Sequence, residues 1–149
     1  MNTAQGASRK IPRPEMNPET QPFWDAAALG KLLVRRCLDC GKVHWYPRSR
    51  CPFCFSGNTE WQPGSGRGTI YTFSIMRRVP VPYAVAYVAL EEGPTMLTNI
   101  VDCELDRIRI GQAVELRFIP CEGGGALPAF TPVFATDFPS VAATPTAHP

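Results

Sequence analysis

The chain has 149 residues, a formal net charge of +2, six cysteines and 44% hydrophobic residues, which suits a small globular protein. Its longest apolar run, from Ala84 to Leu90, is far too short to span a bilayer. The first residues lack a charged stretch followed by an apolar one, so we expect a cytoplasmic protein rather than an exported one.

Charge divides unevenly along the chain. Residues 1–78 carry 12 basic side chains against 5 acidic ones, whereas residues 79–149 carry 3 basic and 8 acidic side chains. This split predicts two surfaces with different partners. It differs from the uniformly basic field of a dedicated nucleic-acid binder.

The first elements are an arm and a short helix. Residues 1–21 are predicted to form a disordered arm, because their prolines and polar side chains show no apolar periodicity. A helix is expected at residues 22–30, where Pro22 suits the first turn and Gly30 the end. Phe23 and Ala27 share one face, which packs either on the chain's own domain or in a partner's groove. The second alternative is open because the adjacent Phe23 and Trp24 are hard to bury together.

Residues 31–63 are predicted to form a zinc ribbon. Two CxxC pairs, Cys37 with Cys40 and Cys51 with Cys54, stand ten residues apart. Each pair can chelate an ion from one tight turn, and two turns complete a tetrahedron. Four sulfur ligands leave no open position, so we expect a structural Zn²⁺ bound by four thiolates. A disulfide framework is the rival hypothesis, but a reducing cytosol favours metal binding.

The two expected knuckles differ in the residue after the second cysteine. Gly41 suits a turn with positive φ, whereas Phe55 stands at the corresponding place of the second pair. A bulky residue held at positive φ costs about 1–2 kcal/mol. The second knuckle is therefore expected to use a different turn, or Phe55 to make an apolar contact.

Residues 64–134 are predicted to form a five-stranded OB-fold barrel after a glycine-rich hinge. β-branched and aromatic runs separated by turn residues indicate strands at 69–75, 83–90, 95–101, 113–119 and 130–134. Residues 135–149, rich in Ala, Pro and Thr, are predicted to be a disordered tail. The expected fold class is mainly β, with a short N-terminal helix, a zinc ribbon and a barrel.

The sequence offers no convincing catalytic set. His148 lies in the predicted tail. His44 lies beside the first knuckle and is interpreted as a half-exposed strand residue. A catalytic triad would therefore have only one available base. Cys103 and Cys121 are interpreted as small buried hydrophobes, because neither has basic neighbours in sequence and the two acids beside Cys103 would raise its thiol pKa. A stand-alone enzyme that uses Cys103 or Cys121 remains a minor hypothesis.

Basic side chains flank the ribbon and the first barrel strand. They either balance the negative zinc–thiolate centre or bind phosphate, as guanidinium groups do. The phosphate would belong to RNA, DNA or a nucleotide-tailed cofactor such as coenzyme A. These side chains are Arg35, Arg36, Lys42, Arg48, Arg50, Arg67, Arg77 and Arg78.

An ordered set of motifs resembles a known family. The set comprises Phe23-Trp24, both CxxC pairs, Pro47-Arg48, Trp61, Gly66-Arg67-Gly68-Thr69, Pro82-Tyr83, Val85-Ala86, Glu92-Gly93-Pro94, Ile110-Gly111 and Pro128-x-Phe130. Over about residues 20–134 the chain resembles the zinc-ribbon/OB-fold proteins known as a domain of unknown function and linked to acyl-CoA metabolism. That resemblance implies a rubredoxin-like ribbon followed by an OB-fold.

The resemblance also implies a function. Members of the family look like accessory subunits, non-catalytic or co-catalytic, of thiolase-superfamily enzymes: thiolases, acyltransferases or retro-aldolases in lipid or aromatic degradation. The small subunit would stabilise a thiolase-like catalytic subunit and help form its acyl-CoA channel. The candidate contacts for coenzyme A or the partner are Phe23, Trp24, Arg48, Arg67, Arg77 and Arg78.

The alternative is a nucleic-acid-binding module, since zinc ribbons and OB-folds also bind nucleic acids. Tyr71 and Phe73 could supply a stacking platform. The acidic second half of the chain opposes this alternative.

Overall fold

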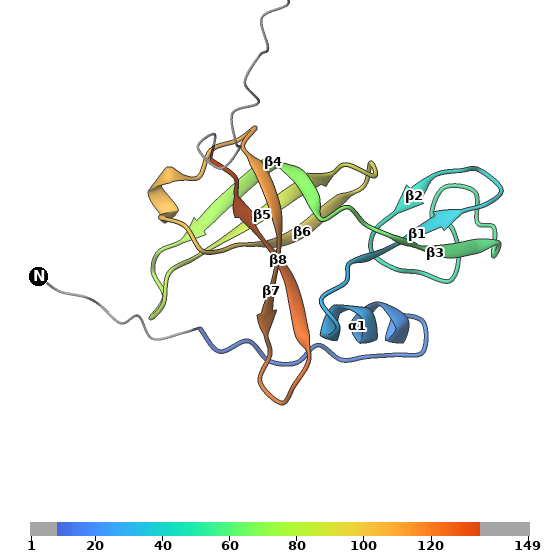
Figure 1. The fold of residues 1–149 in the computed structure, drawn as a ribbon, viewed down its shortest axis with the longest axis horizontal. Helices are drawn as coiled ribbons and strands as arrows, with labels where there is room; N and C mark the ends of the chain where they lie inside the picture. Colours follow the sequence, from blue (N-terminus) through green and yellow to red (C-terminus); the bar gives the residue numbers. More distant parts are fainter. Residues whose placement is uncertain (1–8, 135–149) are drawn as a thin grey trace, which may run out of the picture.

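The computed structural model describes residues 9–134, and its elements are mostly strands (Figure 1). They are α1 (Gln21–Ala28), β1 (Leu33–Cys37), β2 (Val43–His44), β3 (Thr59–Pro63), β4 (Arg67–Met76), β5 (Tyr83–Leu90), β6 (Thr95–Ile100), the 3₁₀ helix η1 (Leu105–Arg107), β7 (Ala113–Pro120) and β8 (Ala126–Pro132). The predicted fold class is confirmed: one short helix precedes a small three-stranded sheet and a closed five-stranded barrel.

Helix α1 packs on the chain's own domain. A turn before it is closed by the Thr20 amide, which donates to the Asn17 side-chain oxygen at 2.9 Å. Gly30, at φ 74°, ends the helix as expected, with its amide donating to the Ala27 carbonyl. Phe23 and Ala27 are both buried on the face that contacts β1 and β8.

Residues 9–20, which the sequence assigns to a disordered arm, lie along the barrel. The Ile11 carbonyl accepts a hydrogen bond from the Glu122 amide at 2.8 Å, and Pro12 forms a parallel bridge with Glu122. The Arg9 guanidinium stacks over the Tyr83 ring at 3.6 Å. Prolines hold this segment extended, and an extended backbone can pair with a loop edge. Residues 1–8 of that arm and the tail 135–149 lie outside the described residues.

The ribbon is a sheet with the strand order β2-β1-β3. Strand β1 pairs with β2 through Arg35 opposite His44 and with β3 through Cys37 opposite Thr59. All pairings are antiparallel, so β1 is the central strand and carries Cys37 at its end.

The barrel has the strand order β4-β5-β6-β8-β7 and closes where the start of β4 pairs with β7. Only Arg67–Thr69 of β4 take part in that seam, opposite Ala113–Glu115. Strand β8 begins at Ala126, four residues before the predicted start. The sequence did not indicate a strand at residues 126–129, because Pro128 has no N–H to donate to a neighbouring strand.

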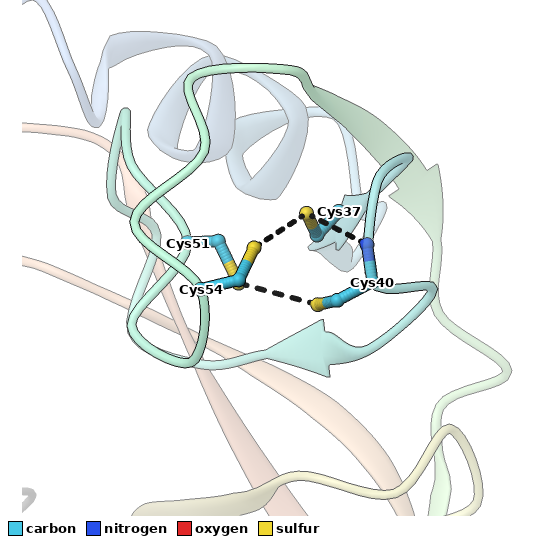
Figure 2. Close-up of side chains that lie close together, drawn as sticks. All are labelled: Cys37, Cys40, Cys51 and Cys54. Atoms are coloured by element: carbon cyan, nitrogen blue, oxygen red, sulfur yellow. Dashed lines mark hydrogen bonds between the residues drawn. The ribbon is translucent and has the colours of Figure 1, made fainter.

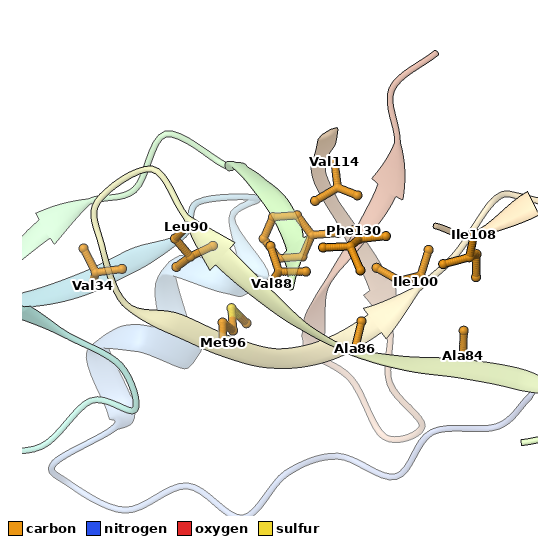
Figure 3. Packing of buried hydrophobic residues seen from close by; sticks show 11 residues of the cluster. Val34, Ala84, Ala86, Val88, Leu90, Met96, Ile100, Ile108, Val114 and Phe130 are labelled. Atoms are coloured by element: carbon orange, nitrogen blue, oxygen red, sulfur yellow. The ribbon is translucent and has the colours of Figure 1, made fainter. Parts of the chain in front are cut away.

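One hydrophobic cluster joins the barrel to the ribbon (Figure 3). Alternate residues of β5, among them Ala86 and Val88, point inward to meet Phe130 of β8. Val34 of the ribbon strand β1 belongs to the same cluster and is fully buried. Because the ribbon contributes to the barrel's core, the two are parts of one packed structure.

Candidate metal centre

Two backbone turns of the same design hold the four cysteines. In the first, the Gly41 amide donates to the Cys37 carbonyl at 2.9 Å; in the second, the Phe55 amide donates to the Cys51 carbonyl at 3.0 Å. The amides of Cys37 and Cys51 donate in return, to the carbonyls of Lys42 and Ser56. Each turn therefore presents two sulfurs from one short loop, as a zinc knuckle does.

The four sulfurs converge on one point (Figure 2). Their Sγ atoms all lie within 4.8 Å of one another, and the Cys37–Cys54 and Cys40–Cys51 pairs are each 3.6 Å apart. A zinc ion with Zn–S bonds of 2.3 Å sets its four sulfurs about 3.8 Å apart. The donor set and its spacing thus fit a tetrahedral zinc, and no described residue adds an oxygen or nitrogen to this cluster.

The four thiols share protons, so the pKa values of Cys51 and Cys54 shift in opposite directions. Burial opposes ionisation of Cys51, but amide donors from Cys54 and Phe53 outweigh it and lower the pKa of that thiol to about 7. An amide donor from Ser56 acts in the same sense on Cys54, yet burial and the three neighbouring sulfurs raise its pKa to about 12. A divalent cation removes this mutual repulsion, which is why four clustered thiolates and a zinc ion stabilise each other.

Phe55 adopts the strained turn with positive φ that was not expected for a bulky residue. Its φ is 61°, close to the 72° of Gly41 in the first knuckle. The side chain is 75% exposed, so it makes no extensive apolar contact with the described chain. Both expectations for the second knuckle, a different turn or an apolar contact, are therefore wrong: the chelate geometry forces the residue to positive φ.

His44 is buried beside the ribbon sheet rather than half-exposed. Only 2% of the residue is accessible, and neither ring nitrogen has a hydrogen-bond partner among the described residues. Burial lowers its pKa against the opposing effect of the Arg48 backbone, and the charges of Arg35 and Arg48 act in the same direction as burial. The ring is thus neutral at pH 7 and packs as a structural group of the ribbon.

The structure does not gather the candidate contacts for coenzyme A or a partner into one site. Arg67 begins the ten-residue strand β4 and Arg77 directly follows it, so at about 3.3 Å per residue the two lie about 30 Å apart. Arg67 Nε is paired with Glu91 at 2.9 Å, and Arg77 is paired with Asp106. Arg48 and Arg78 form no ion pair within residues 9–134.

Phe23 and Trp24 differ in what they offer a partner. Phe23 is fully buried, with its ring centroid 4.7 Å from that of Trp45. The candidate contact of Phe23 with a partner is therefore corrected, because the ring presents no surface. Trp24 is half-buried at a small cavity of about 110 Å³ between Arg13 and Ala126, and its indole N–H has no partner among the described residues.

The remaining cysteines are poor nucleophiles. Burial, followed by the charge of Asp102, raises the pKa of Cys103, and burial also raises that of Cys121. Cys103 lines a pocket of about 370 Å³ at one end of the barrel, together with Arg9 and Tyr83. No local sequence pattern indicates this pocket, because Arg9 and Tyr83 are far apart in the chain and meet only through the path of residues 9–20.

No helix in the described part of the chain is long and apolar enough to cross a membrane. Two family models match consecutive parts of the sequence. The rubredoxin-like zinc ribbon domain of ChsH2 matches residues 24–60, and the C-terminal OB-fold domain of ChsH2 matches residues 61–118. Together with the four-sulfur cluster, the first match confirms the predicted structural zinc.

Relatives carry these domains in several contexts. A DUF35 domain-containing scaffold protein of Methanothermobacter thermautotrophicus is 40% identical over 58% of this chain and 71% of its own length. A benzoylsuccinyl-CoA thiolase subunit BbsA of Geobacter metallireducens is 33% identical over 57% of this chain and 60% of its own. A probable enoyl-CoA hydratase alpha subunit of Thermomonospora curvata is 32% identical over 87% of this chain, which spans only 42% of that relative.

A solved structure shares the whole architecture. The structure described as the Ltp2-ChsH2(DUF35) aldolase contains a chain with a TM-score of 0.71 and 30% sequence identity. The match covers 80% of this chain and 98% of the other. With both domain models matched in order and the fold reproduced, the chain belongs to the DUF35 family of zinc-ribbon/OB-fold proteins.

Proposed function

We propose that this chain is an accessory subunit of an acyl-CoA enzyme complex, with a thiolase-like catalytic subunit as its partner. The observation that carries the proposal is that several relatives are named as subunits or components of enzymes. Their names describe a thiolase subunit, a hydratase alpha subunit and an aldolase assembled from Ltp2 and ChsH2, and the first two act on CoA thioesters.

The chemistry of the chain supports a non-catalytic or co-catalytic role. In residues 9–134 the histidine is a buried structural group, and the two cysteines outside the metal centre have raised pKa values. The partner would then supply the groups that make or cleave the C–C or thioester bond. This subunit would stabilise the partner and help form the acyl-CoA channel.

Its side chains would meet the ligand at more than one place. Arg48 and Arg78, which have no carboxylate partner among the described residues, are the candidates for the ADP phosphates of coenzyme A. Arg67 and Arg77 would first have to leave Glu91 and Asp106. The proposal places the complex in the cytoplasm, where the four zinc-binding cysteines stay reduced.

Co-expression tests the proposal. The chain is produced together with candidate thiolase-like proteins of the same organism, and each pair is followed by gel filtration and by acyl-CoA turnover. A single stable complex, with turnover that falls when this chain is omitted, is the expected result. Separate elution, with activity indifferent to this chain, would refute it.

A second candidate function rests on exposed aromatic side chains of the barrel. Tyr71 and Tyr87 are 69% and 46% exposed on neighbouring strands, and such rings can stack with unpaired bases. Phe73 is half-buried against the core and less available. Titration with a single-stranded oligonucleotide at several salt concentrations separates the two: tight binding with a steep salt dependence would favour nucleic acid.

A further inference from the structure

Three exposed apolar side chains belong to the two loops of the metal centre. Leu38 lies in the first knuckle and is 51% exposed, Phe53 lies in the second and is 54% exposed, and Phe55 directly follows the second and is 75% exposed. We call these three residues the knuckle surface. They come from the two loops that the four cysteines hold together, so zinc binding fixes their relative positions.

Phe55 is unfavourable for the isolated chain on two counts. Positive φ at a residue with a large side chain costs about 1–2 kcal/mol relative to a relaxed backbone. Exposure of its ring to water forgoes the gain that burial of an aromatic side chain would bring. Glycine at the equivalent position of the first knuckle, Gly41, avoids both. Strain retained at an exposed residue is typical of binding sites.

The backbone around Phe55 is held rather than loose. Arg50 donates from a terminal guanidinium nitrogen to the Phe55 carbonyl at 3.3 Å, and the Phe55 amide is bonded to Cys51. The backbone that carries the ring is thus held in place, which lowers the backbone entropy lost when a partner covers the ring.

The surroundings of the knuckle surface are basic. Residues 31–63 contain 6 basic and 2 acidic side chains, so the ribbon keeps a positive charge even after a zinc–tetrathiolate centre removes two units. The Lys42 ammonium lies over the Phe53 ring at 4.7 Å, and Phe55 lines a shallow groove together with Arg48, Arg50 and one acid, Glu19. Of the two acidic groups of the ribbon, Asp39 accepts hydrogen bonds from Ser56 and Asn58 and remains ionised.

We propose that the knuckle surface docks in an apolar pocket rimmed by carboxylates on the catalytic subunit, with Phe55 as the central anchor. The apolar side chains fill the pocket, and the basic residues around them pair with its acidic rim. A protein partner fits better than a nucleic acid, because Leu38 has no ring to stack on a base. This inference rests on the proposed function and adds the surface and the chemistry of the contact.

The test compares two matched substitutions in zinc-loaded protein. Phe55→Gly removes the ring and accepts positive φ without strain, so the knuckle should stay folded. Ile110→Gly, at an exposed residue of the barrel, is the control. Binding to the thiolase-like subunit that forms a complex with the chain in co-expression is measured by biolayer interferometry, and zinc content is measured for each variant.

Phe55→Gly is expected to weaken binding by about 10- to 100-fold with zinc content unchanged, as for a hot-spot aromatic, and Ile110→Gly to leave it unchanged. Lys42→Glu should slow association most at low salt. Wild-type affinity in Phe55→Gly would overturn this inference and leave the proposed function standing. A wild-type chain that binds no such subunit, or that binds an oligonucleotide through Phe55 instead, would overturn both.

Discussion

Replacement of Gly68 by alanine is expected to destabilise the barrel at its closing seam. Gly68 pairs with Leu90 of β5 on one side and with Val114 of β7 on the other. A Cβ at this position would lie 2.6 Å from Val88 Cγ1 and 2.7 Å from the Ala89 carbonyl oxygen. Ordinary contacts begin near 3.4 Å, so strand β5 would have to move by roughly 0.7 Å.

The magnitude follows from two opposing effects. Overpacking of this kind costs about 1–3 kcal/mol. A change from glycine to alanine also lowers the conformational entropy of the unfolded chain, which stabilises the folded state by about 0.4–1 kcal/mol. The free energy of unfolding should therefore fall by about 1–2 kcal/mol.

Urea unfolding of the zinc-loaded protein, followed by circular dichroism, measures this change, with Gly57→Ala as the matched control. Gly57 has no positive φ, and its nearest neighbour to a new Cβ is a terminal nitrogen of Arg50 at 4.0 Å. That variant should be as stable as the wild type or slightly more stable. Equal stability of Gly68→Ala and Gly57→Ala would show that the seam tolerates a side chain and that the steric argument fails.

Three further predictions concern the helix, the histidine and the metal. Phe23→Ala should lower the free energy of unfolding by about 3–4 kcal/mol in a urea titration, because its ring is fully buried against Trp45. The His44 ring, followed by NMR in a His148→Gln background, should titrate below its ordinary pKa of 6.5, since burial disfavours its charged form. Cys40→Ser, or a strong chelator, should remove one zinc per chain and abolish the ribbon pairings, measured by metal analysis and by amide exchange.

Each of these has an outcome that contradicts it. A loss of less than 1 kcal/mol in Phe23→Ala would mean that the helix is not held by its buried face. A His44 midpoint at or above 6.5 would mean that the ring is solvated. Retention of a full zinc complement in Cys40→Ser would exclude Cys40 as a ligand.

The pH dependence of stability follows from the direction of the His44 shift. The unfolded chain binds a proton near pH 6.5, whereas the folded chain binds it only at lower pH. The contribution of His44 is therefore fully present above pH 6.5 and is lost as the pH falls toward the folded pKa. A His44→Gln variant should show a smaller decline in stability over that interval than the wild type.

Local spacing in the sequence was enough for the metal centre and for most strands. Two CxxC pairs place their sulfurs by the geometry of a single turn each, so Cys37 and Cys40 can be recognised without any distant contact. Alternation over residues 83–90 likewise specifies a strand, which the structure reproduces as β5. The first half of β8 was not predicted, because Pro128 argues against a strand in sequence. The strand forms there by pairing with β7, which is distant in the chain.

The side chains that bear on function were decided by tertiary structure. From the sequence alone, it was open for both Phe23 and Phe55 whether the ring packs on the chain itself. In the structure, Phe23 of α1 is buried against Trp45. Phe55, in contrast, is exposed and has a positive φ in the zinc-binding turn. Arg67 and Arg48 were likewise equal candidates for phosphate until the fold brought Glu91 to Arg67.

The sequence by itself thus determined the four-cysteine zinc ribbon and most of the barrel strands, because these depend on near neighbours in the chain. Only the tertiary structure decided which aromatic and basic side chains remain available to a partner. Burial and charge pairing depend on residues such as Trp45 and Glu91, which the fold brings together from distant parts of the chain.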